Sequence, residues 1–130
     1  MLITATQKYV RTSPRKLRYV ADSVRALKKP TLILSHLEVI EKDAAKILAK
    51  VFKTVIANAT NNLKLEPDTL FLKEIQIGEG PTYKRGQPVS RGRFHRIEKK
   101  TSHITITLES LEKAKPVEKP KRKDNNGTKS

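Results

Sequence analysis

The chain has 130 residues, no cysteine and a formal net charge of +15 at pH 7. This length allows one domain, and the lack of cysteine excludes a disulfide framework and a thiolate metal site. No apolar run approaches the roughly 18 residues of a membrane span, and the N-terminus lacks the basic and long apolar regions of a signal peptide. We therefore expect a soluble, cytoplasmic protein that does not enter a membrane and, with 36% hydrophobic residues, has a small core.

The positive charge is segregated along the chain. Residues 7–30 hold eight Lys/Arg and one acid, residues 81–100 hold seven and one, and residues 31–80 hold six and seven. A segregated positive charge favours a binding surface for a polyanion over general solubilisation. We expect that polyanion to be nucleic acid rather than an acidic protein or a membrane surface.

The first elements are a strand over residues 3–11 and a helix that follows it. Ser13 is a good N-cap, and Pro14 falls at the first helical position, where its missing N–H costs nothing. Apolar residues then recur at helical spacing and predict one buried stripe: Leu17, Val20, Ala21, Val24 and Leu27.

A second face of the same helix carries charge. Asp22 can pair with Arg18 and Arg25 along this face. Several cations lie on this face or beside the start of the helix, and they predict phosphate binding. A solvated surface is the alternative. These cations are Lys8, Arg11, Arg15, Lys16, Arg18 and Arg25.

Two further helices are predicted. Residues 30–40 form a short apolar segment that begins a helix near Thr31, and residues 41–62 keep helical spacing through about four turns. The second of these is the predicted core helix. Its lysines predict a solvated face: Lys42, Lys46, Lys50 and Lys53.

Two strands follow, over residues 69–80 and 101–109. Phe71, Ile75 and Ile77 are expected on one side of the first, and Ile104, Ile106 and Leu108 face inward from the second. An antiparallel ribbon is the simplest connection. We predict an α+β domain over residues 1–110, in which a small three-stranded antiparallel sheet packs with three helices. A long β-hairpin over about 78–104 protrudes from it, and residues 111–130 form a basic, disordered tail.

The segment between these strands offers a core almost nothing. Residues 78–91 as one ribbon arm span roughly 45 Å at about 3.3 Å per residue. Gly86 and Gly92 allow close approach and positive φ, and Tyr83 and Phe94 can stack on bases. The phosphate donors of this arm are Lys84, Arg85, Arg91, Arg93 and Arg96. The alternative is a disordered charged loop.

Catalytic and metal motifs are missing from the sequence. The three histidines, His36, His95 and His103, have no ligand spacing, and Gly78-Glu79-Gly80 is followed by Pro81 rather than by a helix. We expect no enzyme activity, no metal and no cofactor.

Four phrases in order resemble one family: RTSPRKLR (11–18), IANATNN (56–62), EGPTYKRGQPVSRGR (79–93) and KKTSHITI (99–106). They are similar to the bacterial-type large-ribosomal-subunit protein number twenty-two. The resemblance implies a cytoplasmic protein that is a monomer within the large ribosomal subunit, binds its rRNA and supports its assembly. It also implies a hairpin that lines the nascent-peptide exit tunnel close to large-subunit protein four.

The resemblance and the cation pattern together select the residues expected to contact rRNA. These are Lys8, Arg11, Ser13, Arg15, Lys16, Arg18, Arg25, Thr82, Lys84, Arg85, Arg91, Arg93, Arg96, Lys99, Lys100, Thr101, Ser102 and His103. The hairpin tip implied to face the tunnel and the nascent peptide is Lys84, Arg85, Gly86, Gln87, Pro88, Val89, Ser90, Arg91, Gly92 and Arg93.

A DNA-bending architectural protein is the alternative reading. A basic β-arm with a proline near its tip can enter a minor groove and bend duplex DNA. Such proteins usually pair as dimers, and nothing in the sequence marks a dimer seam.

Overall fold

The computed structural model describes residues 1–111, so the predicted disorder of the tail over residues 111–130 lies outside the described part, apart from Leu111. The elements in order are β1 (Leu2–Val10), α1 (Pro14–Arg25), α2 (Pro30–Val39), α3 (Asp43–Ala57), a π-helix (Asn58–Asn62), a 3-10 turn (Pro67–Thr69), β2 (Leu70–Pro88), a second 3-10 turn (Ser90–Gly92) and β3 (Phe94–Ser110). The three strands form one antiparallel sheet in the order β1-β3-β2, which confirms the α+β prediction.

The start of α1 has the predicted cap. The Ser13 side chain accepts a hydrogen bond from the backbone N–H of Lys16 at 3.4 Å, and Pro14 occupies the first turn. Four of the five predicted stripe residues are buried, whereas Leu27 lies beyond the helix end and is only partly buried. This stripe lets α1 pack mainly on β2.

The core lies between the helices and one face of the sheet. Helix α3 packs on β1 and β3, and seven of its residues, which are all apolar, are buried, with Phe52 fully enclosed. The α-helix ends at Ala57, and the predicted continuation to residue 62 is a π-helical turn. The four predicted lysines of the solvated face are exposed.

The predicted strands over residues 69–80 and 101–109 correspond to β2 and β3, and the expected alternation of buried residues holds for β3 but not along all of β2. In β3, Ile104, Ile106 and Leu108 are fully buried as predicted. In β2 the pairing register shifts between Leu72 and Glu74. The prediction that Phe71 shares a side with Ile75 and Ile77 is therefore wrong, because the extra residue of a bulge reverses the alternation.

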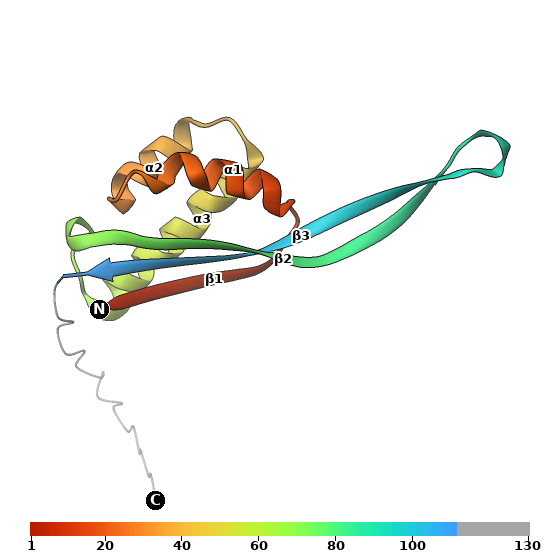
Figure 1. Cartoon of the computed structure of the whole chain (residues 1–130). Helices are drawn as coiled ribbons and strands as arrows, with labels where there is room; N and C mark the ends of the chain where they lie inside the picture. Colours follow the sequence, from red (N-terminus) through yellow and green to blue (C-terminus); the bar gives the residue numbers. More distant parts are fainter. Residues whose placement is uncertain (112–130) are drawn as a thin grey trace, which may run out of the picture.

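Beyond the end of β1, strands β2 and β3 continue as a two-stranded arm. β1 pairs with β3 only as far as Val10↔Ser102, whereas β2 and β3 stay paired to Pro88↔Phe94. All residues from 82 to 88 and from 93 to 100 are exposed, and Figure 1 shows the arm extending far from the helices. The protruding hairpin is confirmed.

The tip of the arm is a tight turn closed by one hydrogen bond from the Val89 N–H to the Arg93 carbonyl, at 2.8 Å. Arg91 and Gly92 have φ of 61° and 69°, so the positive φ predicted for Gly92 is confirmed. Gly86 instead pairs with Arg96 in the regular ladder and has no positive φ.

Candidate nucleic-acid interface

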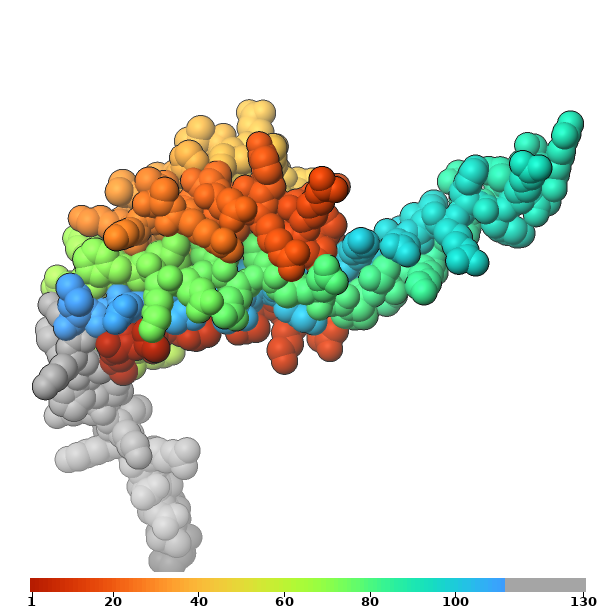
Figure 2. Space-filling model, viewed as in Figure 1, coloured from red at the N-terminus to blue at the C-terminus, as the bar shows by residue number. Residues whose placement is uncertain are grey.

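A cleft of about 1400 Å³ opens where the arm leaves the domain. Its walls are the N-terminal half of α1, the start of α3 and the base of the arm. Figure 2 shows the surface hollowed in this corner, between the helices and the arm. The lining residues are Arg11, Thr12, Ser13, Arg15, Lys16, Tyr19, Glu41, Lys42, Asp43, Ala44, Tyr83, Arg85, Glu98, Lys99, Lys100 and Thr101.

The cleft is strongly basic. Seven of its lining residues are Lys or Arg, against the three acids Glu41, Asp43 and Glu98. Within residues 1–111 the ion pairs are Arg25–Asp22, Lys46–Asp43 and Lys53–Glu38, and none of these includes a cleft cation. Cations gathered in a concavity without carboxylate partners concentrate positive potential, and this arrangement attracts a polyanion.

The base of the arm has two β-bulges, one in β2 and one in β1, which lie on opposite sides of β3. In β2, Gly80 and Pro81 together face the single residue Thr101, and the Thr101 Oγ1 donates a hydrogen bond to the Pro81 carbonyl at 2.6 Å. In β1, two residues face His103 in the same manner. Because bulges bend and twist a strand, this pair sets the direction in which the arm leaves the sheet.

Hydrogen bonds fix the chain around these bulges. Tyr9 has φ of 59°, its backbone N–H donates to the His103 Nδ1 at 3.1 Å, and the two rings meet edge to face at 5.0 Å between centroids. The fully buried Ser102 Oγ donates to the Thr12 carbonyl. This bond connects the loop before α1 to the base of the arm, so it fixes the two walls of the cleft relative to each other.

The structure brings eight of the residues predicted to bind rRNA to this cleft: Arg11, Ser13, Arg15, Lys16, Arg85, Lys99, Lys100 and Thr101. Thr82 and Lys84 line a smaller adjoining hollow of about 200 Å³ next to Pro14. Thr101 and Ser102 are buried, with both hydroxyls bonded inside the protein, so their side chains hold the base of the arm.

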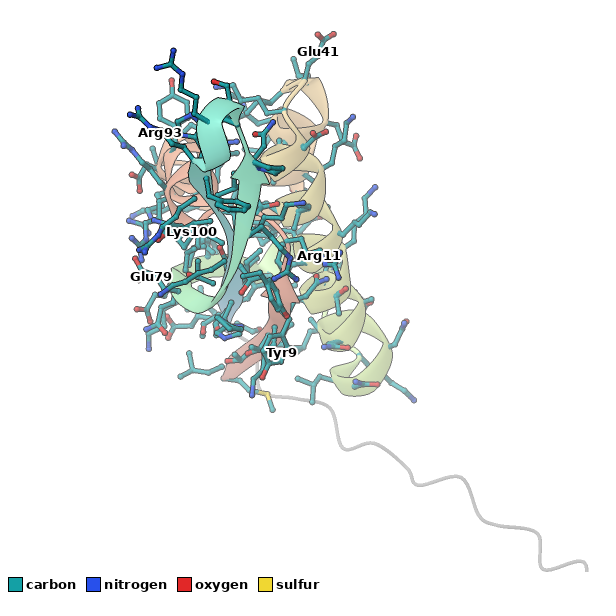
Figure 3. All side chains as sticks on the ribbon, turned by 90° about the vertical axis from the view of Figure 1, so that its right-hand side faces the viewer. Tyr9, Arg11, Glu41, Glu79, Arg93 and Lys100 are labelled. Carbon is teal, nitrogen blue, oxygen red and sulfur yellow. The ribbon has the colours of Figure 1, made fainter. Side chains whose placement is uncertain are left out.

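The remaining predicted residues do not line the cleft, and Lys8 and His103 lie at the bulge of β1. Arg91, Arg93 and Arg96 are exposed in the outer half of the arm. Figure 3 looks along the arm from its tip, with Arg93 at the end and Arg11 and Lys100 farther back toward the domain. The arm therefore continues the basic surface of the cleft outward.

Arg18 and Arg25 contact the sheet as well as solvent. The Arg18 Nη2 donates to the Ile77 carbonyl at 2.9 Å, and the Arg25 Nη2 donates to the Ile75 carbonyl at 3.1 Å. Arg25 also pairs with Asp22 at 3.0 Å, as predicted, but Arg18 forms no ion pair with Asp22. The reason is that β2 is an edge strand, and its outward carbonyls take the Arg18 donor instead.

Two cleft residues were missed by the sequence analysis. Lys42 was assigned to the solvated face of the core helix, and Tyr19 was not singled out. Both line the cleft, and the Lys42 Nζ lies 4.4 Å from the centroid of the Tyr19 ring. Tyr19 follows Arg15 by four residues, and this helical spacing is the signal that could have placed it on the same side of the helix as Arg15.

Comparison with known proteins decides the family. The model of the family Ribosomal protein L22p/L17e matches residues 5–109 of this chain. The chain belongs to this family.

Relatives in the L22p/L17e family include three proteins named large ribosomal subunit protein uL22. The one from Rubrobacter xylanophilus is 48% identical over 80% of this chain and 81% of the relative. The one from Clostridium tetani is 44% identical over 83% and 96%, and the one from Thermomicrobium roseum is 43% identical over 89% and 98%. The region that the family model matches, residues 5–109, contains the cleft, the bulges and the whole arm.

Membership of the L22p/L17e family makes the chain a structural, non-enzymatic component of the large ribosomal subunit in the cytoplasm. As such it associates with rRNA and other ribosomal proteins. The alternative of a DNA-bending protein has no support from these relatives. Over residues 1–111, no helix has the length and apolar character needed to cross a membrane.

Proposed function

We infer that this chain binds large-subunit rRNA through the cleft and the arm, supports assembly of the subunit, and lines the nascent-peptide exit tunnel with the arm's tip. One observation carries the inference. Seven cations that have no carboxylate partner within residues 1–111 lie at the base of an exposed arm that contains further cations. A ribbon with no core of its own needs an external surface against which to pack, and a polyanion suits its charge.

The cleft and the arm act by neutralising phosphates. Arg side chains donate two hydrogen bonds to one phosphate and Lys side chains act as point charges, and binding releases counterions from the RNA. The proposed contact residues are those predicted from the sequence, apart from the buried Thr101 and Ser102, and with Lys42 added.

The tip of the arm, residues 84–93, is proposed to face the tunnel. Apart from the half-buried Val89 it is exposed, and its tight turn contributes Arg91 and Arg93 beside small and polar residues. The nascent peptide and large-subunit protein four are the neighbours that the family resemblance implies for it.

Charge reversal tests the rRNA interface. Arg15→Glu combined with Lys16→Glu should weaken binding to large-subunit rRNA by about tenfold or more, because each change removes a charge-assisted bond and adds repulsion. Lys46→Glu combined with Lys50→Glu reverses the same charge outside the cleft and is the matched control. Equal losses in a filter-binding titration would reject the cleft as the interface.

Site-directed cross-linking tests the position of the tip. A photoreactive amino acid at Gln87 should cross-link to a radiolabelled nascent chain in stalled ribosomes that carry the variant. The same group at Lys50, on the exposed face of α3, should give no such product. Cross-linking at both positions, or at neither, would argue against a tunnel-facing tip.

A further inference from the structure

The cleft contains two exposed aromatic rings from different parts of the chain. Tyr19 comes from α1 and is 69% exposed, and Tyr83 comes from the arm and is 43% exposed. Neither phenol hydroxyl takes part in a hydrogen bond within residues 1–111. The two rings therefore serve neither the core nor a polar network of the described part of the protein.

Each of these rings has a cation beside it. The Lys42 Nζ lies 4.4 Å from the centroid of Tyr19, and the Arg85 guanidinium carbon lies 5.8 Å from the centroid of Tyr83. Both distances fall within the range of cation–π attraction. A cation occupies one face of a ring and restrains it, while the high exposure of both residues leaves ring surface accessible from the cleft.

Aromatic rings among phosphate-binding cations are typical of sites for unpaired nucleic acid. Scattered exposed aromatics are normal on protein surfaces and need no explanation. Here, however, two rings share one concavity with seven cations. Bases stack on aromatic side chains wherever their faces are free, whereas a duplex hides those faces within its own stack.

We propose that the cleft binds an unpaired stretch of RNA, with bases stacked on Tyr19 and Tyr83 and the adjoining phosphates on cations such as Arg15 and Lys16. The inference rests on the proposed function and makes it more specific, because it selects a loop or bulge rather than a helix as the ligand. The two tyrosines provide the preference for unpaired RNA, and the cations provide affinity for any phosphate backbone.

The test uses the full-length chain and a 12-nucleotide RNA that carries one central 2-aminopurine, whose fluorescence is quenched by stacking. The same strand annealed to its complement is the duplex comparison. The wild-type protein should quench the 2-aminopurine fluorescence of the single strand, and it should bind the single strand more tightly than the duplex. A single alanine substitution at Tyr19 or Tyr83 should weaken binding of the single strand by about 5- to 150-fold and leave duplex binding unchanged.

Two controls separate stacking from other effects. Tyr19→Phe and Tyr83→Phe keep the ring and should retain the quenching and the affinity. Phe71→Ala removes another aromatic ring, which is partly exposed at the start of β2 and outside both the cleft and the arm, and should have no effect. An equal loss from Phe71→Ala, or no loss from the tyrosine variants, would overturn the inference.

The same titrations distinguish a failure of the base-stacking proposal from a failure of the proposed rRNA interface. Salt-sensitive binding that is equal for single strand and duplex, and indifferent to the tyrosines, would reject base stacking and leave rRNA binding by the cations intact. If the wild-type chain bound neither these RNAs nor large-subunit rRNA, both the stacking site and the proposed rRNA interface would be wrong.

Discussion

At the scale of single residues, two side chains of α1 and a backbone carbonyl of the loop after it close the outer edge of the sheet. Arg18 and Arg25 donate to the carbonyls of Ile77 and Ile75, and the Leu72 N–H donates to the Lys28 carbonyl at 2.7 Å. Unpaired groups on an edge strand are a template for pairing with another chain. These bonds occupy several such groups of β2 just before the arm begins.

Arg18→Ala should therefore lower the free energy of unfolding by about 1 kcal/mol, because the Ile77 carbonyl loses its donor. Arg15→Ala, on the same exposed side of α1 and with no protein partner in the described structure, should change it by less than about 0.5 kcal/mol. Urea denaturation followed by circular dichroism measures both. Equal stabilities of the two variants would contradict the edge-closing role of Arg18.

Gly80 is the residue at the base of the arm that no other amino acid can replace without a shift. A Cβ atom built there would lie 2.5 Å from the Thr101 Oγ1 and 3.2 Å from the Thr101 backbone carbon and oxygen. The hydroxyl cannot simply turn away, because it is bonded to the Pro81 carbonyl. The contact is therefore with fixed groups rather than with the end of a flexible chain.

Gly80→Ala should destabilise the protein by about 1–3 kcal/mol, the usual cost of overpacking. Gly78→Ala is the matched control, since a Cβ at Gly78 has no atom within 4 Å. Both lie in β2, so the general preference for alanine over glycine in a strand is the same in each. Thermal unfolding of the pair measures the difference, and equal melting temperatures would show that the bulge accommodates a methyl group.

At the scale of elements, the residues that stabilise the domain are not part of the outer arm. A two-stranded ribbon is marginally stable by itself in water. Every buried core residue lies before Gly78 or after Lys100. The domain contributes the bulged base of the arm and nothing along its outer length.

Replacement of residues 84–98 by Asn-Gly should leave the domain folded. The pair Tyr83↔Lys99 then flanks a two-residue hairpin turn, for which Asn-Gly is the preferred sequence. Helical ellipticity and cooperative melting should match those of the wild type. Loss of cooperative unfolding in the shortened chain would show that the arm contributes to the core.

At the scale of the whole molecule, the chain has a net charge of +15, and eleven of its Lys and Arg residues lie in two adjoining places, seven in the cleft and four more along the arm. Such a charge repels itself in isolation and is relieved when phosphates neutralise it. The described structure therefore suits a chain that works inside an RNA particle. The fold makes these cations one continuous basic surface, because the cleft and the arm meet at the bulged base of the arm.

The salt dependence of rRNA binding should reflect the cations gathered in the cleft and along the arm. The logarithm of the affinity for large-subunit rRNA should fall linearly with the logarithm of the salt concentration. Arg15→Glu combined with Lys16→Glu should reduce that slope by about 1.5, the value for two lost phosphate contacts. An unchanged slope with weaker binding would mean that the two residues act through the fold rather than through phosphate.

Local patterns in the sequence determined the elements and the class of partner. The Ser13–Pro14 cap, the stripe from Leu17 to Val24 and the alternation of β3 each depend on neighbours within a few residues, and all were correct. The arm was also predictable, because a charged segment between two apolar strands cannot join a core.

Only the tertiary structure decided features that depend on residues far apart in the chain. The bulge after Leu72 reversed the side of Phe71, because strand register depends on the partner strand. Arg18 took the Ile77 carbonyl rather than Asp22, because α1 lies on the edge of β2. The cleft joins Tyr19 to Tyr83 across 64 positions, and no local spacing encodes a distance set by packing and by two bulges.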